Sequence, residues 1–461
     1  MAKKPITSRL LVKMTMWLVQ HRQKSFILFS VADAIAQQLL RFLKSNPYLR
    51  IRQDGYFMLR ALLFSSLRSR ISEKTLQSLI QNLMSDNYQS KPGAPGFLVL
   101  SPGKMCNLHC PDCYANAANE NNILDFTVLN RIVTEAKEFW GIRFFVISGG
   151  EPFIYRSQGK GIIDLAKAHK DSLFLVYTNG TLINEAVAKE LSLLANLTPA
   201  ISVEGMQQKT DERRGKGTFD KILQAMANLR QAQVPFGLSI TATRYNIPEI
   251  LSDDFIDFFF YQQGATYAWL FHYMPMGRNP NPDAMPTPEQ RIWLWQRTWQ
   301  LIKEKKIMIA DFWNHGTVSQ GCLSAGRSGG YFHIDWNGDV MPCVFFPYAC
   351  ANINEIYKNG GKLSDVLATP LFRKIRQWQD NYGYQKKVLT EMTDWLRPCP
   401  IRDHYEEAYQ IIKQCNPKTT DSSPQGALND TKYYEKMKNY SQKLQKTVNR
   451  IWCREYINSI R

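Results

Sequence analysis

Three cysteines lie within eight residues of the chain: Cys106, Cys110 and Cys113. Soft thiolates in one short segment select zinc or an iron–sulfur cluster. The spacing Cys-x3-Cys-x2-Cys fits neither the paired ligands of most zinc sites nor the cysteine runs of common ferredoxins. Three cysteines in one loop can instead hold three irons of a four-iron cube and leave the fourth iron open to substrate. A structural zinc site is the alternative.

Further motifs follow later apolar runs of the chain. Ser148-Gly149-Gly150-Glu151-Pro152 comes after the second run, Tyr177-Thr178-Asn179-Gly180 closes the third, and Ser202 lies in the fourth. With the cysteine loop, the aromatic Tyr114 and the later Arg213-Arg214-Gly215, this order of motifs resembles the radical S-adenosylmethionine (SAM) superfamily. The resemblance covers about residues 97–280 and continues to about residue 400.

The resemblance implies a chemistry. In the superfamily the open iron is chelated by the amino and carboxylate groups of SAM, and one electron cleaves the sulfonium to give a 5′-deoxyadenosyl radical. That radical abstracts hydrogen from an unactivated carbon, while the protein supplies positioning and excludes water. A small electron donor such as ferredoxin or flavodoxin is implied as a partner.

Carried over position by position, the resemblance gives each motif a role. Cys106, Cys110 and Cys113 are the implied iron ligands, and Tyr114 is placed near the adenine. Glycine lets a backbone approach a ligand closely. The resemblance therefore places the amino group of SAM in a cradle formed by the two glycines and the glutamate of the Gly-Gly-Glu-Pro motif, where the glutamate carboxylate pairs with it. Gly149, Gly150 and Glu151 are the implied residues of this cradle, and Ser202 and Arg214, with Arg213 as a substitute for Arg214, are assigned to the carboxylate or ribose of SAM. Thr178 and Asn179 are further implied cofactor contacts.

A second cysteine group lies farther along the chain. Fifteen residues separate Cys322 from Gly338, and four separate Gly338 from Cys343. This spacing resembles the first half of a SPASM or twitch domain, which binds auxiliary clusters, although the dense cysteine run of a full SPASM domain is missing from the sequence. The resemblance implies one auxiliary four-iron cluster on Cys322, Cys343, Cys399 and Cys415. A three-cysteine cluster with an open iron and a set of ordinary buried thiols are the alternatives.

Short apolar runs alternate with helical patterns after a Pro- and Gly-rich boundary at residues 91–96. Such alternation predicts an α/β protein with a parallel sheet. Six units, with no Gly-x-Gly-x-x-Gly after the first, favour a partial (β/α)6 barrel over a dinucleotide-binding fold. The predicted strands are 97–100, 144–147, 173–177, 200–203, 237–241 and 267–271, with helices such as 125–139 and 219–231 between them. Because barrel sites lie at the carboxyl ends of strands, His272 and Tyr273 are candidate substrate contacts.

Smaller units flank this core. Residues 287–290, Thr-Pro-Glu-Gln, form a capping box that begins a helix, and we expect its Trp293, Trp295 and Trp299 to pack. An Asn-Gly turn at residues 337–338 predicts a β-hairpin in a separate small domain. The predicted organisation is a basic N-terminal helical region over 1–92, a radical SAM core over 93–310, an auxiliary-cluster domain over 311–415, and a loop with a basic helix over 416–461.

Positive charge is concentrated at both ends of the chain. Of a net +17, residues 1–70 hold 13 Lys and Arg against 2 Asp and Glu, and residues 430–461 hold 8 against 3. The helical period places Leu59, Leu62 and Leu63 on one apolar face, and apolar faces beside cations are typical of helices that lie on anionic lipid. We therefore expect a cytoplasmic protein, without signal peptide or membrane span, that attaches peripherally to a membrane. Helices that pack on the barrel with solvated outer faces are the alternative.

The sequence thus predicts an enzyme that cleaves SAM and abstracts hydrogen from an inert carbon, with a lipid or membrane-embedded molecule as the favoured substrate. A peptide-modifying maturase is one alternative, although a helical rather than a winged N-terminal region disfavours it. An iron–sulfur redox or scaffold protein that binds SAM is the non-enzymatic alternative. No nucleic-acid-binding module is recognised in the sequence, so no nucleic acid is expected as a partner.

Overall fold

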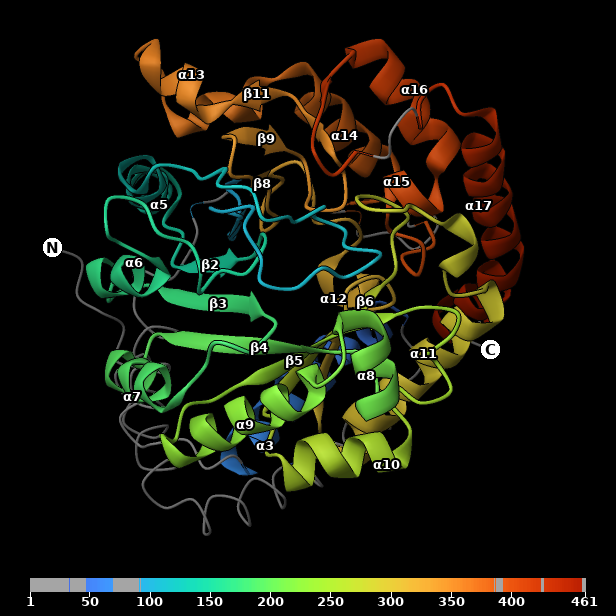
Figure 1. Ribbon diagram of the computed structural model, residues 1–461. Helices are drawn as coiled ribbons and strands as arrows, with labels where there is room; N and C mark the ends of the chain where they lie inside the picture. The colour runs from blue at the N-terminus through green and yellow to red at the C-terminus, as the bar shows by residue number, and fades with distance from the viewer. Residues whose placement is uncertain are drawn as a thin grey trace, which may run out of the picture.

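The computed structural model describes Asp33 and residues 47–68, 91, 93–384, 386, 393–423 and 427–457. Its centre is a sheet of parallel strands in chain order (Figure 1). These strands are β1 (Leu98–Leu100), β2 (Phe144–Ile147), β3 (Leu173–Thr178), β4 (Leu197–Val203), β5 (Gly237–Ala242), β6 (Tyr267–His272) and β7 (Met308–Asp311). The register places Val146 beside Val99 on one side and Leu175 on the other. The α/β class and the six predicted strands are confirmed, and β7 is an additional strand.

Helices follow the strands along the chain. They are α5 (Phe126–Trp140), α6 (Ile162–Ala168), α7 (Glu185–Leu194), α8 (Gln207–Arg214), α9 (Thr218–Gln231), α10 (Asp253–Ile256), η2 (Asp257–Gln262), η3 (Pro282–Ala284), α11 (Pro288–Gln300) and η4 (Leu301–Lys305). Helix α5 shows why they form. Asp125 caps its start by accepting a hydrogen bond from Thr127 N at 2.7 Å, and its apolar stripe, which includes Leu129 and Ile132, is fully buried.

The predicted capping box at the start of α11 is present. Thr287 Oγ1 accepts a hydrogen bond from Gln290 N at 3.2 Å, and Gln290 Oε1 accepts one from Thr287 N at 3.0 Å. Trp295 and Trp299 are buried, as expected for packing residues, whereas Trp293 is 39% exposed.

The chain after β7 adds to the β1 edge of the sheet. Strands β8 (His333–Ile334) and β9 (Asp339–Met341) form the predicted antiparallel hairpin, and β11 (Ala351–Asn352) pairs with β9. Since β8 pairs in parallel with β1, the hairpin continues the barrel sheet instead of forming a sheet of its own. Strand β10 (Tyr348–Ala349) pairs with β12 (Lys418–Thr419), which lies near the start of the loop and helix region predicted over residues 416–461.

The remaining helices follow β7 along the chain. They are α12 (Gly316–Ser319), α13 (Ile353–Lys358), η5 (Leu363–Ala368), α14 (Pro370–Asn381), α15 (Pro400–Asp403), α16 (Tyr405–Cys415), α17 (Thr431–Trp452) and η7 (Cys453–Ile457). The predicted C-terminal helix is α17, which buries Met437, Leu444 and Val448 and packs against α11 (Figure 1).

Helix α3 (Pro47–Arg68) is the described part of the N-terminal helical region, and it packs against β7 and α12. Its face with Met58, Ala61 and Phe64 is buried. The apolar face expected from the sequence points outward instead: Leu59 is 59% exposed, and Leu62 and Leu63 are 36% and 37% exposed.

Polar anchors explain this rotation of α3. Thr317 Oγ1 and Tyr456 Oη donate hydrogen bonds to Asp54 Oδ2 at 2.7 and 2.9 Å, so the side of the helix that carries Asp54 faces inward. The other helical patterns predicted before residue 93 lie outside the described residues. None of the described helices combines the length and the apolarity that a membrane span requires.

Candidate functional site

The cysteine loop connects β1 to α5, at the carboxyl end of a barrel strand. Cys106, Cys110 and Cys113 are free and partly buried. Burial raises the pKa of Cys106 to about 11, and the nearby thiols of Cys110 and Cys113 raise this pKa further because ionised thiols repel one another. Thiols that stay protonated in this way become thiolates when a cation binds them. In the described part of the chain no three His, Cys, Asp or Glu side chains converge on one ion position, whereas a four-iron cube gives each thiolate an iron of its own.

Gly149 and Gly150 follow β2 and pack against the cysteine loop. A Cβ atom on Gly150 would lie 2.2 Å from the carbonyl oxygen of Met105, and one on Gly149 would lie 2.7 Å from that of Gly103. Gly150 N donates a hydrogen bond to Gly103 O at 2.9 Å, and Glu151 N donates one to Met105 O at 2.8 Å, so both bonds join the glycine motif to the cysteine loop. The sequence-based interpretation gave the glycines only an approach to SAM. The structure adds that they let two backbones of the protein pack closely.

Glu151 is buried and holds the end of β3. Its Oε1 accepts hydrogen bonds from Thr178 Oγ1 at 2.7 Å and from Phe153 N at 3.1 Å, and its Oε2 accepts one from Asn179 N at 2.8 Å. Burial raises the pKa of this carboxyl, and the three donors and Arg214 oppose that rise. Glu151 therefore fixes the positions of two other predicted cofactor contacts.

We expect Glu151→Gln to weaken SAM binding while iron content stays unchanged. The side-chain amide of the variant would place its NH₂ group against at least one of the three groups that now donate hydrogen bonds to the carboxylate. It would also remove the negative charge. The loss of a charge-assisted hydrogen bond costs roughly 1.5–3 kcal/mol, or about 10- to 100-fold in affinity. Equilibrium binding of SAM to the anaerobic variant measures this, with the exposed Glu185→Gln as a control. Unchanged affinity for SAM would show that Glu151 neither binds nor positions the cofactor.

A network of ion pairs ties α8 to the cysteine loop. Glu204, at the end of β4 and 2% exposed, pairs with Arg214 at 2.5 Å and with Arg213 at 2.7 Å. Arg213 also pairs with Asp112 of the loop at 2.7 Å. Burial alone would lower the pKa of Arg213, but Glu204 and Asp112 outweigh it and raise the pKa. Glu204 had no role in the sequence-based assignment, although the acidic residue directly after a strand motif was a signal for one.

One cavity of about 260 Å³ unites these groups. The three cysteines of the loop line it, and so do the predicted cofactor contacts Tyr114, Gly149, Gly150, Thr178, Asn179, Ser202 and Arg214. Glu151 is not among the described residues of the wall. Tyr114 Oη lies 2.5 Å from Ser148 Oγ, and Asn179 Nδ2 donates a hydrogen bond to Asn107 Oδ1 at 2.8 Å, so two neighbouring loops are joined here. This polar end offers hydroxyl, amide and guanidinium groups to an amino acid and a ribose.

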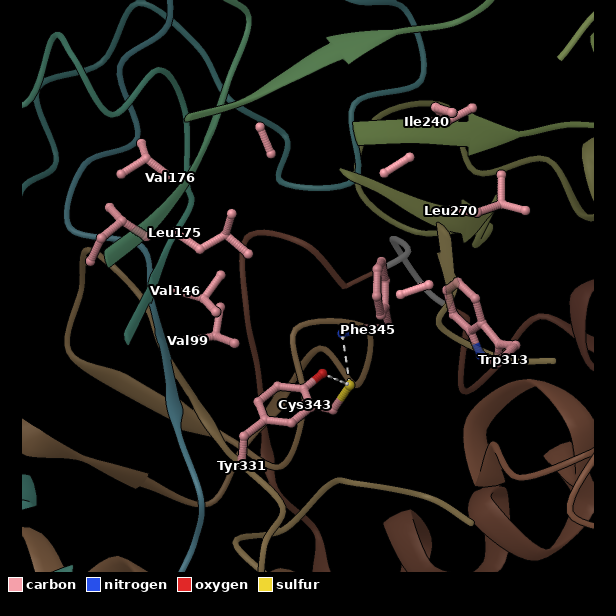
Figure 2. Close-up of a cluster of buried hydrophobic side chains, with 14 of the residues drawn as sticks. Val99, Val146, Leu175, Val176, Ile240, Leu270, Trp313, Tyr331, Cys343 and Phe345 are labelled. Atoms are coloured by element: carbon pink, nitrogen blue, oxygen red, sulfur yellow. Dashed lines mark hydrogen bonds between the residues drawn. The ribbon is translucent and has the colours of Figure 1, made fainter. Parts of the chain in front are cut away.

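Much of the remaining wall is apolar and largely aromatic, although Ser239 and Thr241 of β5 also line it. Its apolar and aromatic residues include Phe97, Val99, Phe144, Val146, Tyr177, Trp269, Phe271, Phe312, Leu323, Tyr331, Val344 and Phe345. The ring centroids of Phe271 and Phe345 lie 5.7 Å apart, so side chains of the barrel and of the C-terminal region meet in this wall. Figure 2 shows Phe345 and Tyr331 between the barrel strands and Cys343. The cavity thus extends from the cysteine loop toward the second group of cysteines.

His272 and Tyr273, the candidate substrate contacts, also line the cavity. His272 is fully buried, and its Nε2 lies 3.1 Å from Asp311 Oδ2. Burial lowers the pKa of His272 more than Asp311 raises it, so the ring is neutral at pH 7. Tyr273 Oη accepts a hydrogen bond from Asn281 N at 3.1 Å. Both side chains are therefore held by the protein at the place where a substrate would lie.

Three of the four predicted auxiliary ligands come together. Cys322 and Cys399 raise the pKa of the Cys343 thiol in addition to the larger effect of burial, which shows that the three thiols are neighbours. Tyr331 Oη lies 2.8 Å from Cys343 Sγ (Figure 2). Cys415 is placed elsewhere, at the end of α16, where its neighbour is the Cys350 thiol. Three thiols from three segments, one buried and two partly buried, fit a cluster ligated by three cysteines.

Comparison with known proteins identifies two domains. The family model of the radical SAM superfamily matches residues 100–260, and that of the SPASM iron–sulfur cluster-binding domain matches residues 322–388. The mycofactocin maturase MftC of Mycolicibacterium smegmatis is 28% identical over 64% of this chain and 76% of its own length. The AdoMet-dependent heme synthase of Methanosarcina barkeri is 25% identical over 63% of this chain and 87% of its own length.

Two solved structures have the same fold. Streptococcus suis SuiB bound to the precursor peptide SuiA has a TM-score of 0.51 and 19% identity, over 66% of this chain and 71% of that one. The enzyme anSMEcpe with bound AdoMet has a TM-score of 0.52 and 17% identity, over 77% of this chain and 99% of that one.

Proposed function

Because the chain belongs to the radical SAM superfamily and carries a SPASM iron–sulfur cluster-binding domain, we propose that it is an enzyme that modifies a peptide at a bulky apolar or aromatic side chain. The two domains imply SAM and iron–sulfur clusters as cofactors. When bound, they supply the electron and the 5′-deoxyadenosyl radical. Cys106, Cys110 and Cys113 hold the first cluster in this proposal, and Cys322, Cys343 and Cys399 hold the auxiliary one.

The aromatic wall of the cavity is the observation that carries this proposal. Side chains such as Trp269, Phe271 and Phe345 surround the space next to the polar end. An apolar group of a substrate gains about 25 cal/mol for each Å² that it buries against such a wall. The same wall excludes water from a radical. A peptide side chain can enter this space while the peptide backbone remains outside it.

The relatives name two substrate classes, and the charges in the cavity distinguish them. MftC is named a mycofactocin maturase and SuiB is bound to a precursor peptide, whereas the heme synthase is named for a porphyrin product. A porphyrin is a large macrocycle with several carboxylates, which require cations. The described wall of the cavity holds two arginines, Arg213 and Arg214, and both are already paired with Glu204. A peptide therefore fits this cavity better. The lipid substrate expected from the basic ends is not supported by these relatives.

Turnover assays with both substrate classes test the proposal. The anaerobically reduced holoenzyme is incubated with SAM and a panel of synthetic peptides that vary in aromatic and branched residues, or with coproporphyrin III. Chromatography measures 5′-deoxyadenosine, and mass spectrometry detects changes in the peptides. We expect some peptides to accelerate 5′-deoxyadenosine formation and to be modified. Acceleration by coproporphyrin III alone would contradict the proposal, and a protein that never forms 5′-deoxyadenosine would be the redox or scaffold alternative.

We expect Trp269→Ala to lower the peptide-dependent formation of 5′-deoxyadenosine about tenfold or more. The loss of one large apolar contact costs about 1.5–3 kcal/mol, and tenfold corresponds to about 1.4 kcal/mol. The slow cleavage of SAM without peptide should persist, because Trp269 lies in the aromatic wall and not among the predicted cofactor contacts. Trp293→Ala, at an exposed position of α11, is the matched control. Equal loss of both activities would assign Trp269 to SAM binding instead.

Peripheral attachment to an anionic membrane stays a prediction. The outward position of Leu59, Leu62 and Leu63 on α3 supports it, as does the excess of Lys and Arg in residues 1–70. Such attachment should weaken with salt, because it depends on attraction between cations and lipid phosphates.

A further inference from the structure

Arg402 is a buried guanidinium with unused hydrogen-bond donors. The residue belongs to α15 and is 0% exposed. Its Nε donates a hydrogen bond to Asp403 Oδ1 at 2.9 Å, but its Nη1 and Nη2 atoms have no hydrogen-bond partner among the described residues. A buried charge is costly unless it is paired and hydrogen-bonded. The four N–H bonds of these two atoms therefore indicate an anionic partner.

The surroundings of Arg402 point to where that partner lies. Cys399, a proposed ligand of the auxiliary cluster, is the N-cap residue of the same short helix. Asp403 N donates a hydrogen bond to Cys399 O at 2.8 Å, and Asp403 Oδ2 accepts one from Cys399 N at 3.2 Å, so Arg402 and Cys399 are held in one rigid turn. Burial raises the pKa of the Cys399 thiol to about 12, and the nearby Arg402 guanidinium opposes this rise.

Trp313 fixes the direction of the guanidinium. The Arg402 Cζ atom lies 4.3 Å from the centroid of the Trp313 ring, which supports the cation on its face. The ring centroid of Trp313 also lies 4.9 Å from that of Phe345, whose backbone N–H donates a hydrogen bond to Cys343 Sγ at 3.4 Å. The ring that supports the guanidinium therefore lies beside the second group of cysteines.

Arg291 and Arg402 share one carboxylate, that of Asp403. Asp403 lies between two arginines: Arg291 Nη1 and Nη2 donate to its two oxygens at 2.6 and 3.1 Å, and Arg402 Nε donates to Oδ1. Arg291 uses its donors on Asp403, Asn314 and Leu396 O, so the guanidinium donors that lack a partner among the described residues are those of Arg402.

We propose that Arg402 is a positioning residue of the auxiliary cluster, which donates hydrogen bonds to the Cys399 thiolate and the adjacent sulfides and thereby raises the reduction potential of the cluster. The inference rests on the proposed auxiliary cluster at Cys322, Cys343 and Cys399. Reduction adds a negative charge to the cluster, and a fixed cation in a medium of low dielectric constant stabilises the reduced state more than the oxidised one. Hydrogen bonds to the sulfurs act in the same direction.

The test isolates the auxiliary cluster in the full-length chain. In a parent protein with Cys106→Ala, Cys110→Ala and Cys113→Ala, the remaining iron belongs to the auxiliary site. Arg402→Met and Arg402→Lys are added to this parent, and a redox titration monitored by electron paramagnetic resonance gives the reduction potential. Arg397→Met is the control, because Arg397 is a buried arginine of the same segment whose charge is paired with Asp394 at 3.1 Å.

We expect Arg402→Met to retain iron and to lower the ratio of reduced to oxidised cluster at least tenfold at a given potential, which is about 59 mV for a one-electron couple. Arg402→Lys should retain most of the parent potential, and Arg397→Met all of it. An unchanged potential in an iron-loaded Arg402→Met protein would overturn the inference.

If Arg402→Met loses its iron, the Arg402→Lys variant decides the question. A potential like that of the parent supports a role of the positive charge, and a lowered potential overturns the inference. A parent without iron would overturn the auxiliary cluster itself, and the inference with it.

Discussion

Simultaneous replacement of Cys106, Cys110 and Cys113 by alanine is expected to remove about half of the iron and to abolish the cleavage of SAM. Two four-iron cubes give about eight irons for each chain, and each cube depends on its own thiolates. The three thiols line the cavity together with the predicted SAM contacts. The second group of cysteines lies on other segments of the chain, so the iron that these cysteines bind should remain.

Anaerobic purification followed by iron, sulfide and zinc analysis measures this, and chromatography of 5′-deoxyadenosine measures the activity. Cys453→Ala is the control, since this cysteine is exposed at the C-terminal end of the structure and belongs to neither group. The double variant Cys322→Ala and Cys343→Ala should lose the other half of the iron. Zinc in place of iron would contradict both cluster assignments, and a triple variant with full iron would contradict the first.

The strands and the first cysteine loop were predictable because their signals are local. An apolar run of four to seven residues between helical patterns usually forms a buried parallel strand. The predicted strand 144–147 coincides with β2, and the others differ only at their ends. Once the strands are placed, the loops after them must meet at one edge of the sheet. This is why the side chains predicted from four separate motifs line one cavity.

The features that were not predictable depend on contacts between distant segments. Fifteen residues separate Cys415 from Cys399, and this spacing alone cannot show that α16 places Cys415 away from the other three cysteines. An eleven-residue helix advances roughly 16 Å, so the fourth predicted ligand ends beside Cys350 instead. In the same way, the rotation of α3 depends on Asp54 and its partners near residues 317 and 456.

The ion pairs of Glu204 are a third feature that the sequence did not predict. The sequence places Arg213 and Arg214 nine and ten residues after Glu204, and only the return of α8 toward β4 brings the three side chains together. Arg214 therefore reaches the cavity already paired with a carboxylate. A role of Arg214 toward the carboxylate of SAM would have to be shared with Glu204, which holds the guanidinium in place.

Gly150→Ala is expected to have the second large effect, since it inserts one methyl group between two backbones. The added Cβ would lie 2.2 Å from Met105 O and 2.4 Å from Lys104 O, and neither carbonyl can move without the cysteine loop. Overpacking of this kind typically costs about 1–3 kcal/mol, and 3 kcal/mol is roughly a hundredfold in an equilibrium constant. The strain falls on the segment that ends at Cys106, so cluster retention and SAM affinity should both decrease.

Gly103→Ala is the matched control for this variant, because it changes a glycine of the same loop. The nearest atom to its Cβ would be Tyr155 Cδ2 at 3.4 Å, which is ordinary contact, and its carbonyl would still accept the hydrogen bond from Gly150 N. Iron content after gel filtration and the SAM dissociation constant should be near normal in Gly103→Ala and strongly impaired in Gly150→Ala, while iron at the auxiliary cysteines is retained in both. Equal behaviour of the two variants would show that the glycine motif tolerates a side chain, and that the close packing of β2's loop on the cysteine loop does not hold the cluster site in place.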